Sequence, residues 1–418
     1  MKRIALAAML GALAFAPAAY ADTTINWLHI ASNPPEVKLM TDAAKEYEAA
    51  HPGIHINMQF LENEAFKAKL TTLLQSNDAP DVFYSWGGGV LSEQVKAGVM
   101  GPIDANVPDD VKTNIGAAGI GAFTRDGHIY GLAQNVSEVV FWYNKPLFAK
   151  AGVDASTMNT WDGFLAGVKK LKDAGVTPIA LGNKDKWPTA FYWDYLAVRL
   201  GGQDEFNKAA TGDGDGFAAP EYVEAGKKLL ELATLQPFQE GFEAASYGDA
   251  SGYFGDGKAA MHLMGDWDYG AMKDNSASKK GIADADLGIM PFPAFSDGKG
   301  DPSDVLGGIN GWIFSKNASP EAVKFMDWYT AKDTQSKFAA GGFFIPIVAG
   351  ASDALANPFQ QEVAKNLGKA HWLSIFFDQQ LGPAVGGTVN DISAALATNS
   401  MTAEDAANEM KQAVADNK

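Results

Sequence analysis

The clearest change between polar and apolar positions along the chain lies in residues 254–268, where a polar turn leads into an apolar run. A charged turn there is followed by a mostly apolar run, residues 259–264, which has the length of a buried strand. Gly265 ends the run, and Asp266 is a good helix N-cap, so a helix should follow. Trp267 would then lie on the first helical turn, beyond the carboxyl end of the strand, where open α/β sheets bind ligands.

The three residues at this junction favour a particular ligand chemistry. Asp266 and Asp268 flank Trp267 and would place hydrogen-bond acceptors beside a flat apolar ring. That combination suits the CH face and the hydroxyl groups of a sugar. Tryptophans near helix starts more often pack in a core, and the residues alone leave that alternative open.

Strand and helix patterns alternate from residue 25 onwards. Strands are predicted at residues 25–30, 54–60 and 79–84, and glycine or proline breaks occur near them at residues 34–35, 52–53, 80 and 87–89. Between the first two, the apolar residues Val37, Met40, Ala44 and Tyr47 recur at helical spacing. This alternation predicts a parallel sheet in an α/β lobe.

Polar and aromatic residues follow each of these three strands. The carboxyl ends of strands in a right-handed doubly wound sheet share one edge, so the three loops should meet. The glycine run at residues 87–89 lacks the spacing of nucleotide-binding loops and favours close approach of a bulky ligand to the backbone. The candidate contacts in these loops are His29, Ser32, Asn33, Glu62, Trp86 and Gly87.

Two segments resemble a known family. Residues 130–145 begin Tyr-Gly-Leu-Ala and end Tyr-Asn-Lys. Residues 257–267 begin Gly-Lys-Ala-Ala-Met, continue with His-Leu-Met and end Gly-Asp-Trp. Both are similar to segments of the extracellular sugar-binding proteins of bacterial ABC importers, the maltose-binding-like group. Weaker similarities extend the resemblance over nearly all of residues 22–417.

The resemblance implies a two-lobed periplasmic-binding-protein fold of the α/β class, class II-like. A ligand cleft would lie between lobes joined by crossing strands, with residues 130–145 as the first crossing and 305–314 as the second candidate. Lobe 1 would comprise residues 22–138 plus 308–345. Lobe 2 would comprise residues 139–307 plus 346–418. In the family, the tryptophan that corresponds to Trp267 stacks on the sugar.

Some of the further candidates, such as Asn135 and Glu138, match positions that reach the ligand in this family. Trp187 and Phe191 lie in an aromatic segment at the start of a helix expected to end at residues 201–202, and core packing is an equal alternative for both and for Phe343. Beyond the six loop residues above, the candidate ligand contacts are Asn135, Glu138, Trp187, Phe191, Asp266, Trp267, Asp268, Asn310, Phe343 and Asp378.

The N-terminus and the composition indicate export. Lys2 and Arg3, an apolar stretch at residues 4–16 and an Ala-Tyr-Ala site predict a signal peptide over residues 1–21, too short to remain as a membrane anchor. The sequence has no cysteine, which excludes disulfides, thiolate chemistry and a lipid-modified cysteine. We therefore expect the periplasm. A net charge of −17 disfavours nucleic acid and anionic lipid as partners.

The sequence contains few signs of catalysis. It lacks the H-E-x-x-H and G-x-S-x-G motifs, and Pro52 and Gly53 prevent His51 and His55 from sharing a helical face, so neither a metal nor a cofactor is expected. Paired carboxylates cannot be judged from the pattern, and a secreted glycoside hydrolase stays as an alternative. A binding protein for a non-sugar solute is a second alternative.

Arginine usage bears on the charge of the ligand. After removal of the signal peptide only Arg125 and Arg199 would remain, and bidentate capture of carboxylates or phosphates usually employs arginine. We therefore expect a neutral mono- or oligosaccharide, bound by hinge closure and delivered to the membrane subunits of an ABC importer, as the resemblance implies. The protein should be a monomer without enzymatic activity, nucleic-acid binding or membrane insertion.

Overall fold

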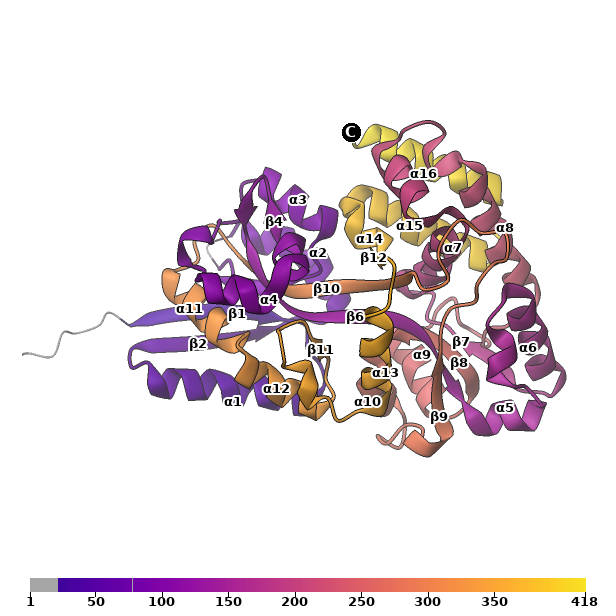
Figure 1. Ribbon diagram of the computed structural model, residues 1–418, viewed down its shortest axis with the longest axis horizontal. Helices are drawn as coiled ribbons and strands as arrows, with labels where there is room; N and C mark the ends of the chain where they lie inside the picture. Colours follow the sequence, from indigo (N-terminus) through magenta and orange to yellow (C-terminus); the bar gives the residue numbers. More distant parts are fainter. Residues whose placement is uncertain (1–21, 77) are drawn as a thin grey trace, which may run out of the picture.

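The computed structural model describes residues 22–76 and 78–418, so the predicted signal peptide lies outside the described residues. Ten strands of these residues form one mixed sheet, with the order β2-β1-β3-β10-β6-β8-β7 along its main path. In Figure 1 this sheet runs through both halves of the molecule, and helices pack around each half. The α/β class expected from the sequence is confirmed.

The first half is built from strand–helix alternation. Strand β1 pairs in parallel with both β2 and β3. Polar residues that follow the three strands therefore come to the same edge of the sheet. The elements of this half are β1 (Thr23–His29), α1 (Pro34–Ala50), β2 (Ile54–Phe60), α2 (Asn63–Leu74), β3 (Val82–Ser85), α3 (Gly88–Lys96), α4 (Asp109–Ala122), β4 (Thr124–Arg125), β5 (His128–Ile129), α11 (Pro320–Tyr329) and α12 (Lys332–Gly341).

Two long antiparallel strands join the halves: β6 (Gly131–Asn144) and β10 (Val305–Phe314). Strand β6 pairs with β10 along its first part, and with β8 (Ala259–Gly265) and β9 (Leu287–Met290) along its second part. Both long strands cross the middle of the molecule in Figure 1.

Strand β10 needs its glycines because it lies very close to β6. A Cβ on Gly307 would come 1.9 Å from the carbonyl oxygen of Ser137, and one on Gly311 would come 2.2 Å from that of Leu132. The register shifts between these glycines, at Asn310 and Gly311. The Gly-rich pattern of this strand thus reflects close backbone approach and a bulge.

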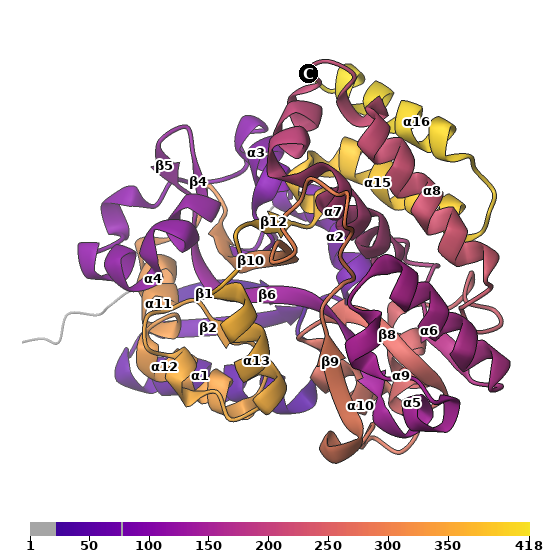
Figure 2. The same cartoon turned by 45° about the vertical axis from the view of Figure 1, so that its right-hand side comes forward.

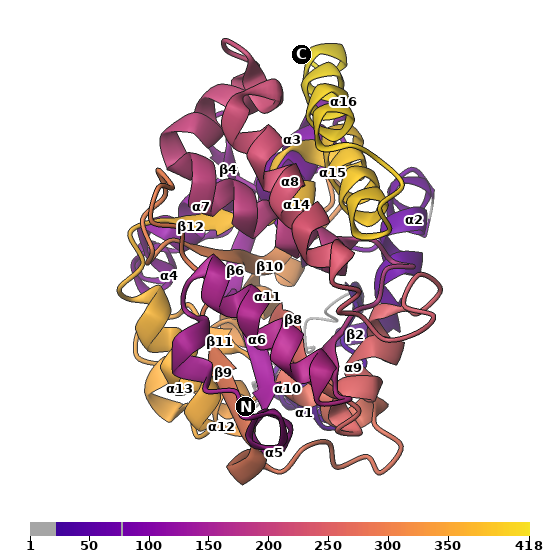
Figure 3. The same cartoon turned by 90° about the vertical axis from the view of Figure 1, so that its right-hand side faces the viewer.

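The second half contains most of the helices, which Figure 3 shows covering the end of the molecule that faces the viewer. Figure 2 shows α13 beside the crossing strands. The elements of this half are α5 (Lys145–Ala151), α6 (Trp161–Asp173), β7 (Thr177–Ala180), α7 (Trp187–Thr211), α8 (Pro220–Thr234), α9 (Tyr247–Gly255), α10 (Asp268–Asn275), α13 (Pro358–Leu367), β12 (Leu373–Ile375), α14 (Phe377–Gln380), α15 (Gly382–Ala397) and α16 (Ala403–Asp416). The short strand β11 (Ile345–Pro346) lies beside α12 and pairs with the first part of β6.

Apolar side chains form two separate cores. The first core draws on residues 25–133 and 312–351. The second core draws on residues 139–306 and 355–414, with two additional residues of α12 and β11. The half-buried side chain of Trp86 packs against both. The molecule therefore has two halves, each with its own core, and the two crossing strands connect them.

Helix α7 is interrupted at Gly202, whose non-helical conformation (φ 70°) separates two helical stretches, so the helix end expected at residues 201–202 coincides with this kink. Two other boundaries differ from the sequence expectation. The sequence pattern favours a loop over residues 237–252, but α9 (Tyr247–Gly255) begins within that stretch, and its start is fixed by a capping box of Ser246 and Asp249. Helix α10 begins at Asp268, because the carboxylate of Asp266 accepts a hydrogen bond from β6 instead of capping the helix.

Candidate functional site

Four aromatic side chains gather at the carboxyl end of β8, and we call them the aromatic wall: Trp187, Phe191, Trp267 and Phe376. The ring centroids of Trp187 and Phe191 are 5.4 Å apart, and those of Phe191 and Phe376 are 5.2 Å apart. Trp267 lies 6.4 Å from Phe191 and 6.0 Å from Phe376. Each such pair adds about 0.5–1.5 kcal/mol beyond area burial. The rings therefore fix one another in place.

Gly265 sets the position of the half-buried Trp267 ring. A Cβ at residue 265 would lie 2.0 Å from Cζ3 of Trp267, closer than any real contact. The indole thus rests directly against the glycine backbone. This contact gives a physical reason for the Gly-x-Trp spacing in the sequence.

A buried hydrogen-bond network supports the wall from behind, centred on Asp268. Its Oδ1 accepts hydrogen bonds from Ser251 (2.6 Å) and from the hydroxyl of Tyr247 (3.1 Å), and its Oδ2 bonds to Nδ1 of His262 (2.8 Å). The ring of Tyr247 lies 5.0 Å from that of Trp187. The hydrogen bond from Tyr247 to Asp268 thus holds Tyr247 against the wall. Asp268 itself is fully buried and does not face solvent.

The carboxyl groups of Glu138 and Asp266 are both buried and lie where β6 enters the second half. The amide of Glu138 donates to Oδ1 of Asp266 over 3.3 Å. Burial raises the pKa of Asp266 to about 7; burial, and then the charge of Asp266, raise the pKa of Glu138 to about 8. Oε2 of Glu138 and Oδ1 of Asn310 have no hydrogen-bond partner within the described chain. A protonated carboxyl group can donate as well as accept.

Candidates after the first strands serve mainly as helix caps. Oδ1 of Asn33 accepts from the amide of Glu36 at the start of α1, and Nδ2 of Asn33 donates to Asp274 of α10 over 2.5 Å, across the two halves. Glu62 caps α2 by accepting from two of its first amides. Ser32 is exposed beside these caps. Burial lowers the pKa of His29 to about 4.

Trp86 follows β3 in the first half and packs against both cores. Its ring meets those of Phe66 and Tyr84 at 5.8 and 5.3 Å. The residue that follows, Gly87, has a φ of 68° and precedes α3. A side chain there would meet the carbonyl oxygen of Ala122 at 3.1 Å.

The remaining candidates lie further apart. Asn135 is buried and pairs with Asn310 across the β6–β10 ladder. Phe343 packs against the first core, 6.3 Å from Phe338. Asp378 accepts from the side chain of its neighbour on α14. The structure therefore brings together Trp187, Phe191 and Trp267, with Asp266 adjacent and Asp268 behind them.

Sequence reasoning missed Phe376, which belongs to the aromatic wall, and Tyr247, which packs against Trp187 of the wall. Phe376 is far from Trp267 in the sequence, and only the fold brings their rings to 6.0 Å. Tyr247 lies at the start of α9, where the sequence pattern favours a loop. The serine and aspartate of its capping box were the available signal.

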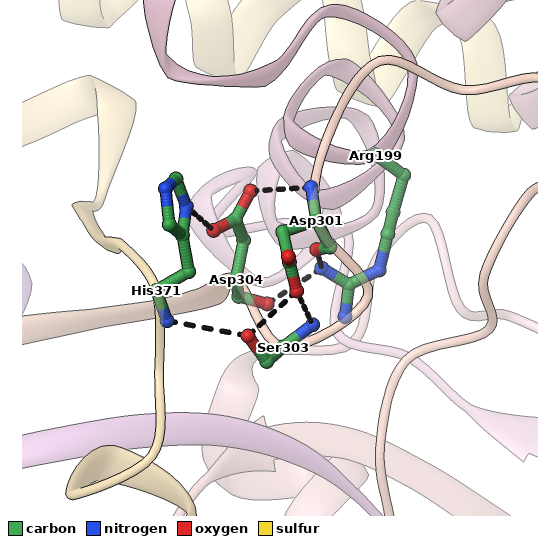
Figure 4. A network of polar contacts seen from close by, with 5 residues as sticks. All are labelled: Arg199, Asp301, Ser303, Asp304 and His371. Atoms are coloured by element: carbon green, nitrogen blue, oxygen red, sulfur yellow. Dashed lines mark hydrogen bonds and ion pairs between the residues drawn. The ribbon is translucent and has the colours of Figure 1, made fainter.

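Both arginines of the described chain are held by internal acceptors. The guanidinium of Arg199 donates to the carbonyl oxygens of Asp304 (2.5 Å) and Phe292 (3.4 Å). The carboxylate of Asp304 in turn bonds to the ring of His371 and accepts from the amide of Asp301, each over 2.9 Å. Figure 4 shows this network without Phe292. Arg125 donates to Gly88 and Ser92. Neither arginine belongs to the aromatic wall.

Residues 22–76 and 78–418 contain neither a metal-binding cluster nor a membrane-spanning helix. No group of three or more histidine, aspartate or glutamate side chains is arranged to hold a metal ion. No helix in this part of the chain has the length and apolar character needed to cross a membrane.

Comparison with known proteins gives consistent matches. An uncharacterised ABC transporter extracellular-binding protein of Pyrococcus horikoshii is 29% identical over 389 residues, 90% of this chain and 84% of that protein. A solved structure reported with insights into xylan utilization by the thermophilic bacterium Caldanaerobius polysaccharolyticus has a TM-score of 0.86 and 26% identity, covering 93% of this chain and 99% of that one. A solved chitin oligosaccharide binding protein has a TM-score of 0.83 and 25% identity, covering 94% and 98%.

The match to a family extends over most of the chain. The family described as bacterial extracellular solute-binding protein matches residues 31–336. The two-lobed architecture expected from the sequence is confirmed by the solved structures. The chain belongs to the family of bacterial extracellular solute-binding proteins.

Proposed function

We propose that this protein captures a neutral mono- or oligosaccharide and delivers it to the membrane subunits of an ABC importer. The observation that carries the proposal is the aromatic wall at the carboxyl end of β8, with Trp86 on the opposite half. Flat rings stack on the CH faces of pyranoses. The chitin oligosaccharide binding protein, similar over 94% of this chain, supports the same ligand class.

The polar groups near the wall suit hydroxyl groups rather than a charged ligand. The raised pKa values of Glu138 and Asp266 keep a proton available there, so both could donate to a sugar oxygen and accept from a sugar hydroxyl. Both arginines are engaged elsewhere. A ligand carboxylate or phosphate would therefore lack an arginine, the residue that usually binds such groups in bidentate fashion.

The mechanism is closure of two lobes about the crossing strands. We take the lobes to be residues 22–138 plus 308–345 and residues 139–307 plus 346–418. The two cores divide the chain at similar positions but not at the same ones, since Val348 and Ala351 pack in the first core. A sugar that contacts both lobes favours the closed arrangement by its additional contacts there. The importer would then recognise the surface of the closed form.

The cellular setting follows from the family and from the N-terminus. Removal of residues 1–21 as a signal peptide would release the protein into the periplasm, where it would act as a monomer without a cofactor. It would bind neither nucleic acid nor the membrane itself. Intact-mass measurement of the exported protein tests the cleavage site, and light scattering tests the monomer.

Isothermal titration calorimetry tests the ligand class. We expect at least one of maltotriose, xylotriose and N,N′-diacetylchitobiose to bind at micromolar concentration or tighter, with unchanged sugar recovered by chromatography. Release of a shorter sugar would support the glycoside hydrolase alternative. Binding only of amino acids or polyamines would support a non-sugar solute.

Replacement of Trp267 tests the wall directly. Trp267→Ala should weaken binding of the best sugar by at least ~0.5–1.5 kcal/mol, the value of one aromatic contact. Trp161→Ala is a control, because Trp161 lies in the second core away from the wall. Unchanged sugar affinity in a folded Trp267→Ala protein would assign that ring to packing alone.

A further inference from the structure

One lysine links the aromatic residues of the two halves. Nζ of Lys67, on α2, lies over the ring of Trp86 and over the ring of Trp187, 5.6 Å from each centroid. Helix α2 packs on the first core, whereas Trp187 belongs to the second. Its acidic neighbour Glu64 is 3.4 Å away, a loose contact. This ammonium therefore contacts one carboxylate of its own helix and two indole rings, one from each half.

Each of these contacts is a cation–π interaction. An ammonium within about 6 Å of an indole centroid is attracted by roughly 0.5–1 kcal/mol at exposed sites and by more when water is excluded. The Lys67 side chain is 28% exposed, so its charge is partly shielded from water. Because both rings interact with the same charge, separation of the halves would break at least one of the contacts.

We propose that Trp86 and Trp187 form one subsite shared by the two lobes, and that Lys67 is its internal occupant. In the unliganded protein the Lys67 ammonium draws the lobes together. A pyranose unit that stacks on these two indoles takes the place of the ammonium. Lys67 thus lowers the affinity for neutral sugars at this subsite. The competition, but not the bridge, rests on the proposed sugar-binding function.

Small-angle X-ray scattering of the unliganded protein tests the bridge without any sugar. Lys67→Met removes the charge and keeps a chain of similar length, so its radius of gyration should exceed that of the unaltered protein. Lys67→Arg keeps the cation and should not change it. Lys69→Met, at an exposed position of the same helix, is the matched control. An unchanged radius of gyration in a folded Lys67→Met protein would overturn the bridge.

Calorimetry with maltotriose, xylotriose and N,N′-diacetylchitobiose tests the competition. The Lys67→Met protein has no cation–π contacts to lose when a sugar enters the subsite. It should therefore bind the sugar roughly 5- to 30-fold more tightly than the unaltered protein does. Lys67→Arg and Lys69→Met should bind as the unaltered protein does. Equal binding by Lys67→Met would show that Lys67 does not compete with the sugar. Weaker binding would make Lys67 a direct sugar contact, and either result would overturn the proposed competition.

The two experiments separate the proposals. If none of the three sugars binds the unaltered protein, the sugar-binding function fails, and the scattering comparison still decides the bridge. Lys67→Gln is a second uncharged variant for both measurements if Lys67→Met does not fold. Thermal melts of all variants establish that they are folded.

Discussion

The two sides of the candidate cleft use the same kinds of residue differently. On the first half, the polar residues after the strands are occupied as helix caps, as Asn33 and Glu62 illustrate. On the second half, Asp266 and Asp268 do not cap α10, and instead pair with β6 and hold Tyr247. Polar residues at strand ends therefore have local roles on one side and tertiary roles on the other.

This difference has a consequence for mutations. A cap satisfies amide groups within one helix turn, so its loss affects mainly that turn. The Asp268 network joins three separate elements, so its loss affects the whole support of the aromatic wall. We therefore expect larger effects on the second side.

The largest effect is expected from Asp268→Ala. It leaves the hydroxyls of Ser251 and Tyr247 and a ring nitrogen of His262 without their acceptor in a buried place. The free energy of unfolding should fall by about 3–5 kcal/mol, measured by chemical denaturation. Asp268→Asn keeps one acceptor oxygen and should lose less. Equal losses in both variants would contradict this view of the network.

The next effect is a dependence of stability on pH. Glu138 and Asp266 have pKa values of about 8 and 7 in the folded protein, above their ordinary values near 4. The folded state thus binds more protons than the unfolded state in this range. The stabilisation is complete below about pH 4 and is lost as the pH rises through 7 to 8.

Denaturation at a series of pH values measures this dependence. The free energy of unfolding of the unliganded protein should decrease by an amount on the order of 1–4 kcal/mol between pH 5 and pH 9. Asp266→Asn should flatten the slope, whereas Asp297→Asn, at an exposed loop position, should leave it unchanged. An equal slope in Asp266→Asn would assign the dependence to other groups.

Gly265→Ala tests the contact that orients Trp267. The added Cβ would force the indole away, because it would lie 2.0 Å from Cζ3. We expect a loss of about 1–3 kcal/mol in unfolding free energy, together with weaker sugar binding. Gly387→Ala is the matched control, because a Cβ there meets no atom within 4 Å. Unaltered sugar affinity would mean that the ring position is not critical.

The smallest effects are expected for the caps of the first half. Asn33→Ala and Glu62→Ala should each cost about 0.5–2 kcal/mol of unfolding free energy. Asn33→Ser keeps a capping oxygen but loses the hydrogen bond to Asp274, and so separates the cap from the contact between halves. If Asn33→Ser is as unstable as Asn33→Ala, the contact with Asp274 dominates.

Local patterns predicted a large part of this molecule. The strand at residues 259–264, the glycine after it and Trp267 beyond it are all where the pattern indicated. The caps at Asn33 and Glu62 were accessible in principle, because a cap and its amides are adjacent in sequence. The sequence analysis instead assigned both residues to ligand contact.

Other features depend on distant partners and had no local signal. Asp268 bonds to residues 17 and 21 positions earlier, and the role of this aspartate follows only from that packing. Phe376 and Lys67 reach their aromatic partners through the fold alone. Periodicity reports which face of an element is buried, but not which side chain of another element covers it.

Strand β6 has a further consequence for the folding of the chain. It is paired along its length with strands of both halves, and almost all of its residues are buried. Neither half can lose its order without exposing part of this shared strand to water. We therefore expect the two halves to melt together in a single transition, which calorimetry of the unliganded protein would show.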